Sequence, residues 1–326
     1  MRWLALVFAL SPAAAGAATP GEIGAALIAP ALERFATEAA ALDKSAEADC
    51  TAAALRPAYD AAFDAWLGVA VYRIGPTEAD ALGIAFWPDE KGLTPKGLRA
   101  LLAAKDEAAL TPDGFAEGSA AVRGFFALDQ MLGDAELSGY GAEDVACRVV
   151  QAIAGDLSRS ASALKTDWDG FMPMLATAGE AGNTTYLSGE EATRALYTQL
   201  LSGIEFAADQ RLGRPLGTFD KPRPTRAEAW RTGRPLRNVA VSLDALQPLA
   251  HELAGAETPV TDAAFAAVRT AMAAVADPTL QDLGDPQAWL KVEIVQSRLR
   301  SLYDAVETEV GGRLGLEAGF NSLDGD

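Results

Sequence analysis

Helical periodicity is the feature that most constrains the fold of this chain. Apolar side chains recur along its 326 residues at the three- and four-residue spacing of an α-helix, and no stretch shows a convincing strand-like alternation. Several periodic segments are longer than about 20 residues, which is typical of helical bundles. The sequence therefore predicts an all-α fold with helices over about residues 20–43, 48–72, 94–104, 116–132, 142–171, 188–212, 226–230, 236–254, 261–276 and 285–310.

The connections between these helices indicate how the chain is divided. Half of the residues are apolar, so the chain can bury one large core or two of ordinary size. A small, polar stretch over residues 176–190 favours a boundary there, giving helical-bundle domains over 18–180 and 181–326. The similarity between "GFFALDQML" at 124–132 and "GIEFAADQRL" at 203–212 supports two related halves. Two Gly- and Pro-rich segments, 74–93 and 211–230, are predicted to be long irregular loops, which often carry function.

The first seventeen residues have the pattern of a secretory signal peptide. Arg2 is followed by an apolar run and by "AAAGA", so we expect cleavage after Ala17 and a periplasmic protein. No later run approaches 18 uninterrupted apolar residues, so no membrane span is expected in the mature protein. The net charge of −18, from 27 basic and 45 acidic residues, argues against nucleic acid and anionic lipid as partners.

Cys50 and Cys147 are the only cysteines, and export makes a disulfide possible. Both lie in predicted helices of one domain, which favours pairing over the alternative of two separate buried thiols. Neither has a neighbouring histidine, so neither is expected to be a catalytic thiol.

The usual catalytic motifs are missing from the sequence. His251 is the only histidine, so neither a two-histidine zinc site nor a His-Glu-x-x-His box can form. Conventional Ser-His-Asp and Cys-His arrangements would need His251 itself as the base. There is no Gly-x-Ser-x-Gly, P-loop or dinucleotide fingerprint.

Acids, arginines and tryptophans beside loops remain as candidates. They are concentrated in "FWPD" at 86–89, around Asp129, in "RAEAWR" at 226–231 and in the terminal "GFNSLDGD". In the structural alternative, the tryptophans only fix loops to helices, Glu228 pairs with Arg226 or Arg231, and the terminus is a frayed tail. In the functional alternative these segments form a binding site or interface, with candidate residues Trp87, Asp89, Arg123, Gly124, Phe126, Asp129, Arg226, Glu228, Trp230, Arg231, Asn321 and Asp324.

Asp129 is the most unusual of these residues because of its position on its helix. At about 100° per residue from Ala121, Asp129 falls at about 80°, between Phe125 at about 40° and Phe126 at about 140°. An unpaired buried carboxylate is costly, so we expect a partner on the other half of the molecule. The candidates are Arg231 or Arg226, or a cation shared with Asp89 and the terminal acids.

Several separated motifs resemble the imelysin-like family: "GP" at 75–76, "FWPDEKG", "AVRGFFALD", "RLGRPLG", "RPTRAEAWRTGRPLRNV" and "GLEAGFNSLDGD". The resemblance covers nearly the whole mature chain. It implies two helical-bundle domains with a site near their interface, in a family of exported bacterial proteins classed with peptidases and linked to iron uptake. The family signature Gly-x-His-x-x-Glu aligns onto Gly124, Phe126 and Asp129.

The departure from that signature shapes the expected function. Phe126 can neither bind a metal ion nor carry a proton, so a histidine-dependent zinc hydrolase is excluded, whereas an oxygen-only metal site that uses Asp129 stays open. We expect a non-catalytic periplasmic protein that binds a metal ion (iron or another cation) or a small ligand, and that works with other components of a periplasmic iron-uptake system. The alternatives are a metal-dependent peptidase that uses carboxylates, and a structural protein with only an interdomain salt-bridge network.

Overall fold

The computed structural model describes residues 16–316, where all regular secondary structure is helical apart from one isolated bridge between Thr218 and Lys221. The expectation of an all-α fold is confirmed. The longer helices are α2 (Ala29–Ala48), α3 (Ala52–Ala70), α4 (Pro76–Ile84), α5 (Leu93–Ala104), α7 (Gly124–Gly133), α8 (Val145–Ala176), α9 (Gly189–Glu205), α11 (Pro235–Ala254), α12 (Pro259–Met272) and α13 (Pro286–Val306).

Short helical elements extend or connect these helices. Three are π-helical turns that continue a neighbouring α-helix without a break: η1 (Gly24–Ile28), η4 (Phe206–Leu212) and η7 (Glu307–Gly311). The others are α1 (Pro20–Ile23), η2 (Ala108–Leu110), α6 (Pro112–Ala116), η3 (Ala120–Val122), α10 (Gly213–Leu216), η5 (Pro224–Arg226), η6 (Trp230–Thr232) and α14 (Gly312–Leu314). The predicted signal peptide, except for its last two residues, lies outside the described range, and so do Asn321 and Asp324.

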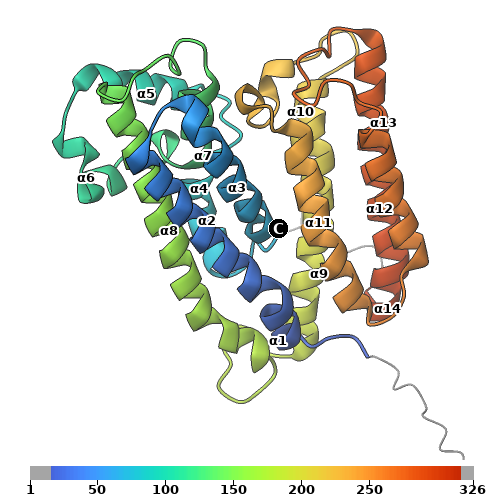
Figure 1. The fold of residues 1–326 in the computed structure, drawn as a ribbon. Coiled ribbons are helices and arrows are strands. Elements are labelled where there is room, and N and C mark those ends of the chain that lie inside the picture. Colours follow the sequence, from blue (N-terminus) through green and yellow to red (C-terminus); the bar gives the residue numbers. More distant parts are fainter. Residues whose placement is uncertain (1–15, 317–326) are drawn as a thin grey trace, which may run out of the picture.

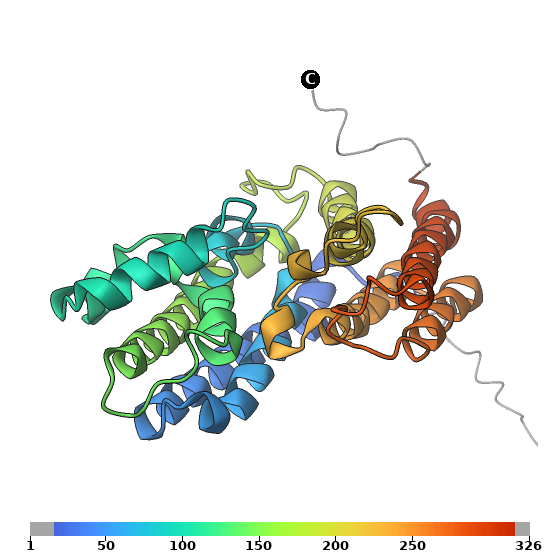
Figure 2. The ribbon, with the colours of Figure 1, turned by 90° about the horizontal axis from the view of Figure 1, so that it is seen from above.

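The helices gather into two groups that meet along α3 and α11. Figures 1 and 2 show the helices of residues 16–176, coloured blue to green, on one side and those of 189–316, yellow to red, on the other. Helix α3 packs against α2 and α7 in its own group and against α11 in the other. The buried apolar residues of both groups form one continuous cluster. A domain boundary at 180/181 stays a prediction.

Local sequence explains where the first helix begins. The Thr19 hydroxyl accepts a hydrogen bond from the Glu22 backbone N–H, and the Glu22 carboxylate accepts one in return from the Thr19 N–H at 2.8 Å. This reciprocal cap satisfies two of the N–H groups that a helix start leaves unpaired, and Pro20 follows at the first helical position.

Helix α7 lies in the centre of its group, and every residue from Gly124 to Leu132 is buried. A helix that is apolar on nearly all sides belongs in a core. Even the polar Gln130 is buried.

Three predicted segments differ from the structure. The helix expected over 116–132 begins only at Gly124, whose φ of +70° ends the preceding turn. Segment 74–93 is not irregular throughout, because it contains α4. The helix expected over 226–230 is replaced by the separate 3₁₀ turns η5 and η6, with an extended Ala227 between them.

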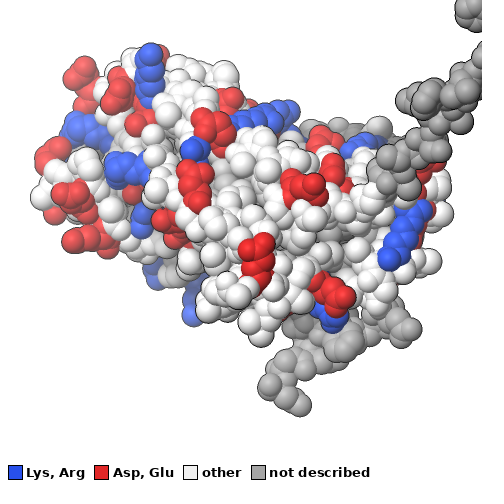
Figure 3. All heavy atoms as spheres, turned by 90° about the horizontal axis from the view of Figure 1, so that it is seen from below, with Lys and Arg blue, Asp and Glu red and all other residues white. Residues whose placement is uncertain are grey.

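The predicted disulfide is confirmed. Cys50 and Cys147 are bonded, with their Cα atoms 5.4 Å apart, and the bond ties the start of α3 to α8. Among the residues that the structure describes, no helix combines the length and apolar composition that a membrane crossing requires. On the face shown in Figure 3, acidic side chains lie among basic and uncharged ones and do not form a single patch.

Candidate functional site

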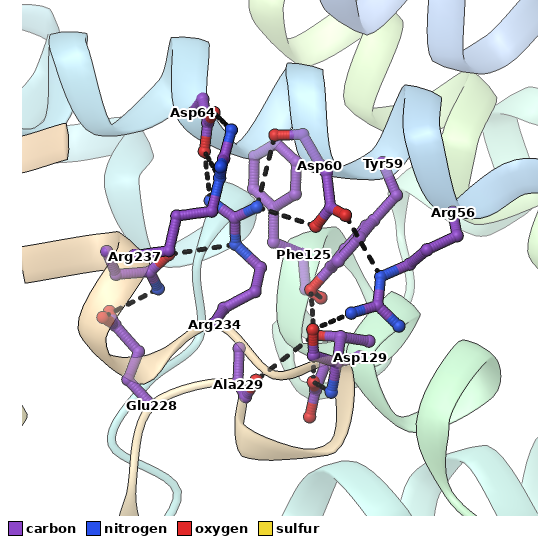
Figure 4. A network of polar contacts seen from close by, with 12 residues as sticks. Arg56, Tyr59, Asp60, Asp64, Phe125, Asp129, Glu228, Ala229, Arg234 and Arg237 are labelled. Atoms are coloured by element: carbon purple, nitrogen blue, oxygen red, sulfur yellow. Dashed lines mark hydrogen bonds and ion pairs between the residues drawn. The ribbon is translucent and has the colours of Figure 1, made fainter. Parts of the chain in front are cut away.

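The Asp129 carboxylate is held by a segment from the other helical group. Its Oδ1 atom accepts hydrogen bonds from the Thr232 backbone N–H at 2.9 Å and from the Thr232 hydroxyl at 2.6 Å. The Arg231 guanidinium lies 3.9 Å from Oδ2. Figure 4 shows the carboxylate directed at the turn that carries Ala229. Burial raises the pKa of Asp129 to about 6, although the contacts with Thr232 and Arg231 act to lower it.

Gly133 and the strained Ala229 allow this close approach, and Gly124 allows the start of α7 to approach the end of α4. A Cβ at Gly133 would lie 2.6 Å from the Arg231 carbonyl oxygen, so the end of α7 can meet this segment only without a side chain. At the other end of the helix, a Cβ at Gly124 would lie 2.1 Å from the Ile84 carbonyl oxygen. Ala229 has a φ of +45°, a conformation unfavourable for a residue with a Cβ. Its carbonyl accepts the Arg234 N–H at 3.1 Å, which holds the turn in place, and lies 3.2 Å from the Thr232 hydroxyl oxygen.

A second layer of polar groups extends from Thr232 to α3. The Tyr59 hydroxyl lies 3.2 Å from the Thr232 hydroxyl, and Arg56 donates to the Thr232 carbonyl. Arg56 also pairs with Asp60 at 3.3 Å. Burial raises the pKa of Tyr59 well above its ordinary value, and the charge of Asp129 adds to this effect. The phenol therefore remains protonated and acts as a hydrogen-bonding group.

The network continues through Arg234, which is only 1% exposed. Its guanidinium donates to Asp60 at 2.8 Å, to Asp64, and to the Asn238 amide oxygen at 2.9 Å. Asn238 in turn donates to Glu228 at 2.9 Å. Figure 4 shows Asp60, Asp64 and Arg234 converging between α3 and the segment that leads into α11.

Glu228 ends the network in an ion pair with Arg211 at 2.6 Å, and both side chains are buried. The connected network contains five arginines and five carboxylates, so its formal charges cancel: Arg56, Arg211, Arg231, Arg234 and Arg237 with Asp60, Asp64, Asp129, Asp134 and Glu228. Balanced pairing of this kind is what buried charges require. These groups therefore hold the two helical groups together, and the space beside them offers a binding site.

That space is a cavity of about 310 Å³ between three segments. Its walls come from the loop after α4 together with the start of α5, from α7, and from the chain that runs from α10 to η6. Its lining includes the predicted residues Trp87, Asp89, Phe126, Asp129, Arg226, Trp230 and Arg231, together with Thr94, Gln130 and Arg214. The volume is at the lower end of the range for small-molecule sites.

A smaller cavity of about 130 Å³ shares Trp87 and Phe126 with the first. The Trp87 ring stacks on Phe126 with centroids 6.0 Å apart and meets Phe206 edge-on at 5.9 Å. Phe126 and Phe206 occupy matching places in the two similar sequence segments, "FALDQ" and "FAADQ". The indole of Trp87 therefore contacts the phenylalanine that occupies the same position in each of the two segments.

Other predicted residues lie outside the larger cavity. Arg123 does not reach Asp129: it pairs with Asp156 on α8 at 2.7 Å, because its extended backbone precedes α7 and directs the side chain away. Gly124 contributes its backbone conformation only. Glu228 lines the smaller cavity, and its partner is Arg211, not Arg226 or Arg231. Asp89 lines the larger cavity, but its two oxygens accept the N–H groups of Leu93 and Thr94 at the start of α5.

The residues that hold Asp129 in place were not predicted from the sequence. Thr232 lies one position beyond "RAEAWR", and Arg234 four beyond Trp230. A signal was present in α3, where Arg56, Tyr59 and Asp60, and then Asp64, recur at helical spacing within an otherwise apolar segment. This is the same kind of interruption that singled out Asp129.

The donors around Asp129 do not fit a metal ion. Within residues 16–316 no group of three or more His, Cys, Asp or Glu side chains is arranged to hold one. Phe126 supplies no ligand atom, Oδ1 of Asp129 is engaged by Thr232, and the cationic Arg231 faces Oδ2. The lining of the cavity suits polar and aromatic contacts with a small molecule better than coordination of a bare cation.

Comparisons with known proteins agree on the fold. A family model described as Imelysin matches residues 28–306. An imelysin-like protein from Psychrobacter arcticum 273-4 superimposes with a TM-score of 0.73 and 19% identity, over 92% of this chain and 96% of the other. A protein assigned as an iron-regulated protein A precursor from Parabacteroides distasonis ATCC 8503 gives 0.62 and 15%, over 91% and 98%. No curated protein matches the chain significantly.

Proposed function

Because this chain belongs to the imelysin family, we propose that it is an exported, periplasmic binding protein that serves bacterial iron uptake without catalysing a reaction. The larger cavity is its binding site. The iron link follows from the family resemblance and from the name of the Parabacteroides neighbour.

The observation that carries the proposal is the cavity beside Asp129. Phe126 and Asp129, which align with the family signature, both line this cavity. Phe126 stands where the signature has a histidine, so the imidazole that metal-assisted catalysis would use is missing. Thr232 donates two hydrogen bonds to Oδ1 of Asp129, whereas Oδ2 has only the Arg231 guanidinium nearby, at 3.9 Å. A charge-balanced network beside a partly aromatic cavity favours binding over turnover.

Growth under iron limitation tests the proposal. A strain lacking the gene should grow more slowly than its parent when iron is scarce and equally well when iron is plentiful. Complementation with the wild-type gene should restore growth, and the protein should be recovered from the periplasmic fraction without residues 1–17. Equal growth of deletion strain and parent under iron limitation would overturn the iron link, and retention in the cytoplasm would overturn the location.

A peptidase assay tests the alternative function. Purified protein incubated with casein and with zinc, iron or calcium should release no more peptide than a buffer control. Metal-dependent cleavage that is abolished by Asp129→Asn would show that the protein is an enzyme and overturn the non-catalytic proposal.

A further inference from the structure

Positive charge is concentrated in the segment that forms one wall of the larger cavity. Residues 211–237 contain seven arginines and one lysine but only two acids, Asp220 and Glu228, in a chain whose net charge is −18. A basic segment of this kind in an acidic protein favours an anionic partner at that place.

Most of these arginines already have carboxylate partners. The pairs are Arg211 with Glu228, Arg214 with Glu90, Arg231 with Asp134, Arg234 with Asp60 and Asp64, and Arg237 with Asp64. Over the range that the structure covers, Arg223 and Arg226 form no ion pair. Both are exposed, but only Arg226 lines the larger cavity.

Among the described residues, no acid of the cavity forms a close ion pair with Arg226, although Glu90 lies near enough to interact with its charge. Asp89 is occupied by two backbone N–H groups, Glu90 by Arg214 at 2.9 Å, and Asp129 by Thr232. The cavity therefore has one guanidinium able to accept an anion in the two-pronged geometry that carboxylates fit.

Buried polar atoms without partners gather around the same cavity. Seven buried side-chain atoms within the described residues have no hydrogen-bond partner, and four belong to residues that line it: Thr94 Oγ1, Gln130 Oε1, Arg214 Nε and Trp230 Nε1. Thr94 is 2% exposed and Gln130 is 8% exposed. Unpaired buried polar groups are rare, so their clustering points to a missing ligand that both donates and accepts hydrogen bonds.

Aromatic rings give the cavity its apolar surface. Trp87 lies against Phe126, the Arg214 guanidinium lies 5.8 Å from the Trp87 ring, and Arg231 lies 4.5 Å from that of Trp230. Flat rings beside flat guanidinium groups favour a planar ligand.

We infer that the larger cavity binds a small aromatic carboxylate, with the carboxylate on Arg226 and the ring against the tryptophans. This inference rests on the proposed binding function and names its ligand class. A single substituted ring fits about 310 Å³. A hydroxyl beside the carboxylate both donates and accepts hydrogen bonds, and the unpaired buried groups include both acceptors and donors. The same carboxylate could arrive free or as a ferric chelate, in which the ligand supplies the iron-binding atoms that the cavity lacks.

Calorimetric titration of the whole mature protein tests the inference. The probes are 2-hydroxybenzoate, its ferric complex, and 2-hydroxybenzamide, which has the same shape without the charge. We expect binding of the first or second probe, and at least tenfold weaker binding of the amide. Arg226→Gln should weaken carboxylate binding at least tenfold, whereas Arg223→Gln, its exposed neighbour outside the cavity, should change it less than twofold.

The possible outcomes distinguish failure of the proposed ligand class from failure of the iron-linked function. Binding of 2-hydroxybenzoate alone identifies the free acid as the ligand form, and binding of the ferric complex alone identifies the chelate. No binding of either, equal binding of the amide, or indifference to Arg226→Gln would overturn the inference. Tight binding of ferric ion without any carboxylate would also overturn it. The growth test does not depend on any of these results, so the iron-linked function can hold even if this ligand class is wrong.

Discussion

Asp129 and Thr232 are 103 positions apart in the sequence, yet the Thr232 backbone N–H and hydroxyl both donate to one oxygen of the Asp129 carboxylate, at 2.9 and 2.6 Å. This contact joins the central helix of one helical group to the turn that precedes α11 in the other. The same carboxylate also lines the candidate cavity, so it takes part both in the contact between the helical groups and in the cavity wall.

The first prediction concerns pH. The pKa of Asp129 is raised to about 6 by burial, against about 3.9 in an unfolded chain. At a pH between these two pKa values, the Asp129 carboxyl is mostly protonated in the folded state and mostly ionised in the unfolded state. The ionised carboxylate therefore lowers stability above pH 6, and this penalty disappears as the pH falls towards 4.

Urea denaturation of the wild type and Asp129→Asn from pH 4 to 7 measures this effect. Subtracting the two curves removes the contributions of the other acids. The free energy of unfolding of the wild type, relative to the variant, should fall by up to about 3 kcal/mol as the pH rises through this window. A difference that stays constant with pH would show that Asp129 titrates normally.

The second prediction isolates the Thr232 hydroxyl. Thr232→Val removes the donor at 2.6 Å while keeping the shape of the side chain, so it should destabilise the fold by about 2 kcal/mol. It should also raise the pKa of Asp129 further. Thr232→Ser keeps both donors and serves as the matched control, with a loss below about 1 kcal/mol. A larger loss in Thr232→Ser than in Thr232→Val would mean that packing of the methyl group, and not the hydrogen bond, stabilises the contact.

The third prediction compares two arginines on the same carboxylate. Arg234 and Arg237 both pair with Asp64, but the side chain of Arg234 is 1% exposed and that of Arg237 is 56% exposed. Arg234→Ala leaves Asp60, Asp64 and Asn238 without their buried partner and should cost about 3–5 kcal/mol in chemical denaturation. Arg237→Ala should cost less than about 1 kcal/mol, since solvent replaces an exposed partner. An equal cost for both would contradict the assignment of Arg234 as the buried centre of the network.

The fourth prediction concerns the disulfide. Cys50 and Cys147 close a loop of 97 positions, so replacing both by serine should lower the free energy of unfolding by about 4–5 kcal/mol in the chain-entropy model. Thiol titration of the denatured, non-reduced periplasmic protein should find no free thiol. Detection of two thiols there would show that the bond does not form in the cell.

The sequence by itself determined the class of fold, because helical periodicity is a local property that each segment carries in its own order of apolar residues. It also determined that Asp129 needed a partner, since a carboxylate among Phe125, Phe126 and Leu132 is buried wherever that helix packs. The cysteine pair and the departure from the family signature at Phe126 were equally legible from residue types.

Only the tertiary structure decided which partner Asp129 has and where the helices stop. Thr232 reaches Asp129 because Gly133 admits the Arg231 backbone and Ala229 takes a left-handed conformation. Neither of these backbone features produces a periodic pattern in the sequence. Segment 226–230 has helical composition, but the buried pair of Glu228 with Arg211 and the contacts of the Ala229 carbonyl outweigh that local preference. Helix propensity amounts to a few tenths of a kcal/mol per residue, whereas a buried charge left without its partner costs several, so long-range pairing sets the geometry of the site.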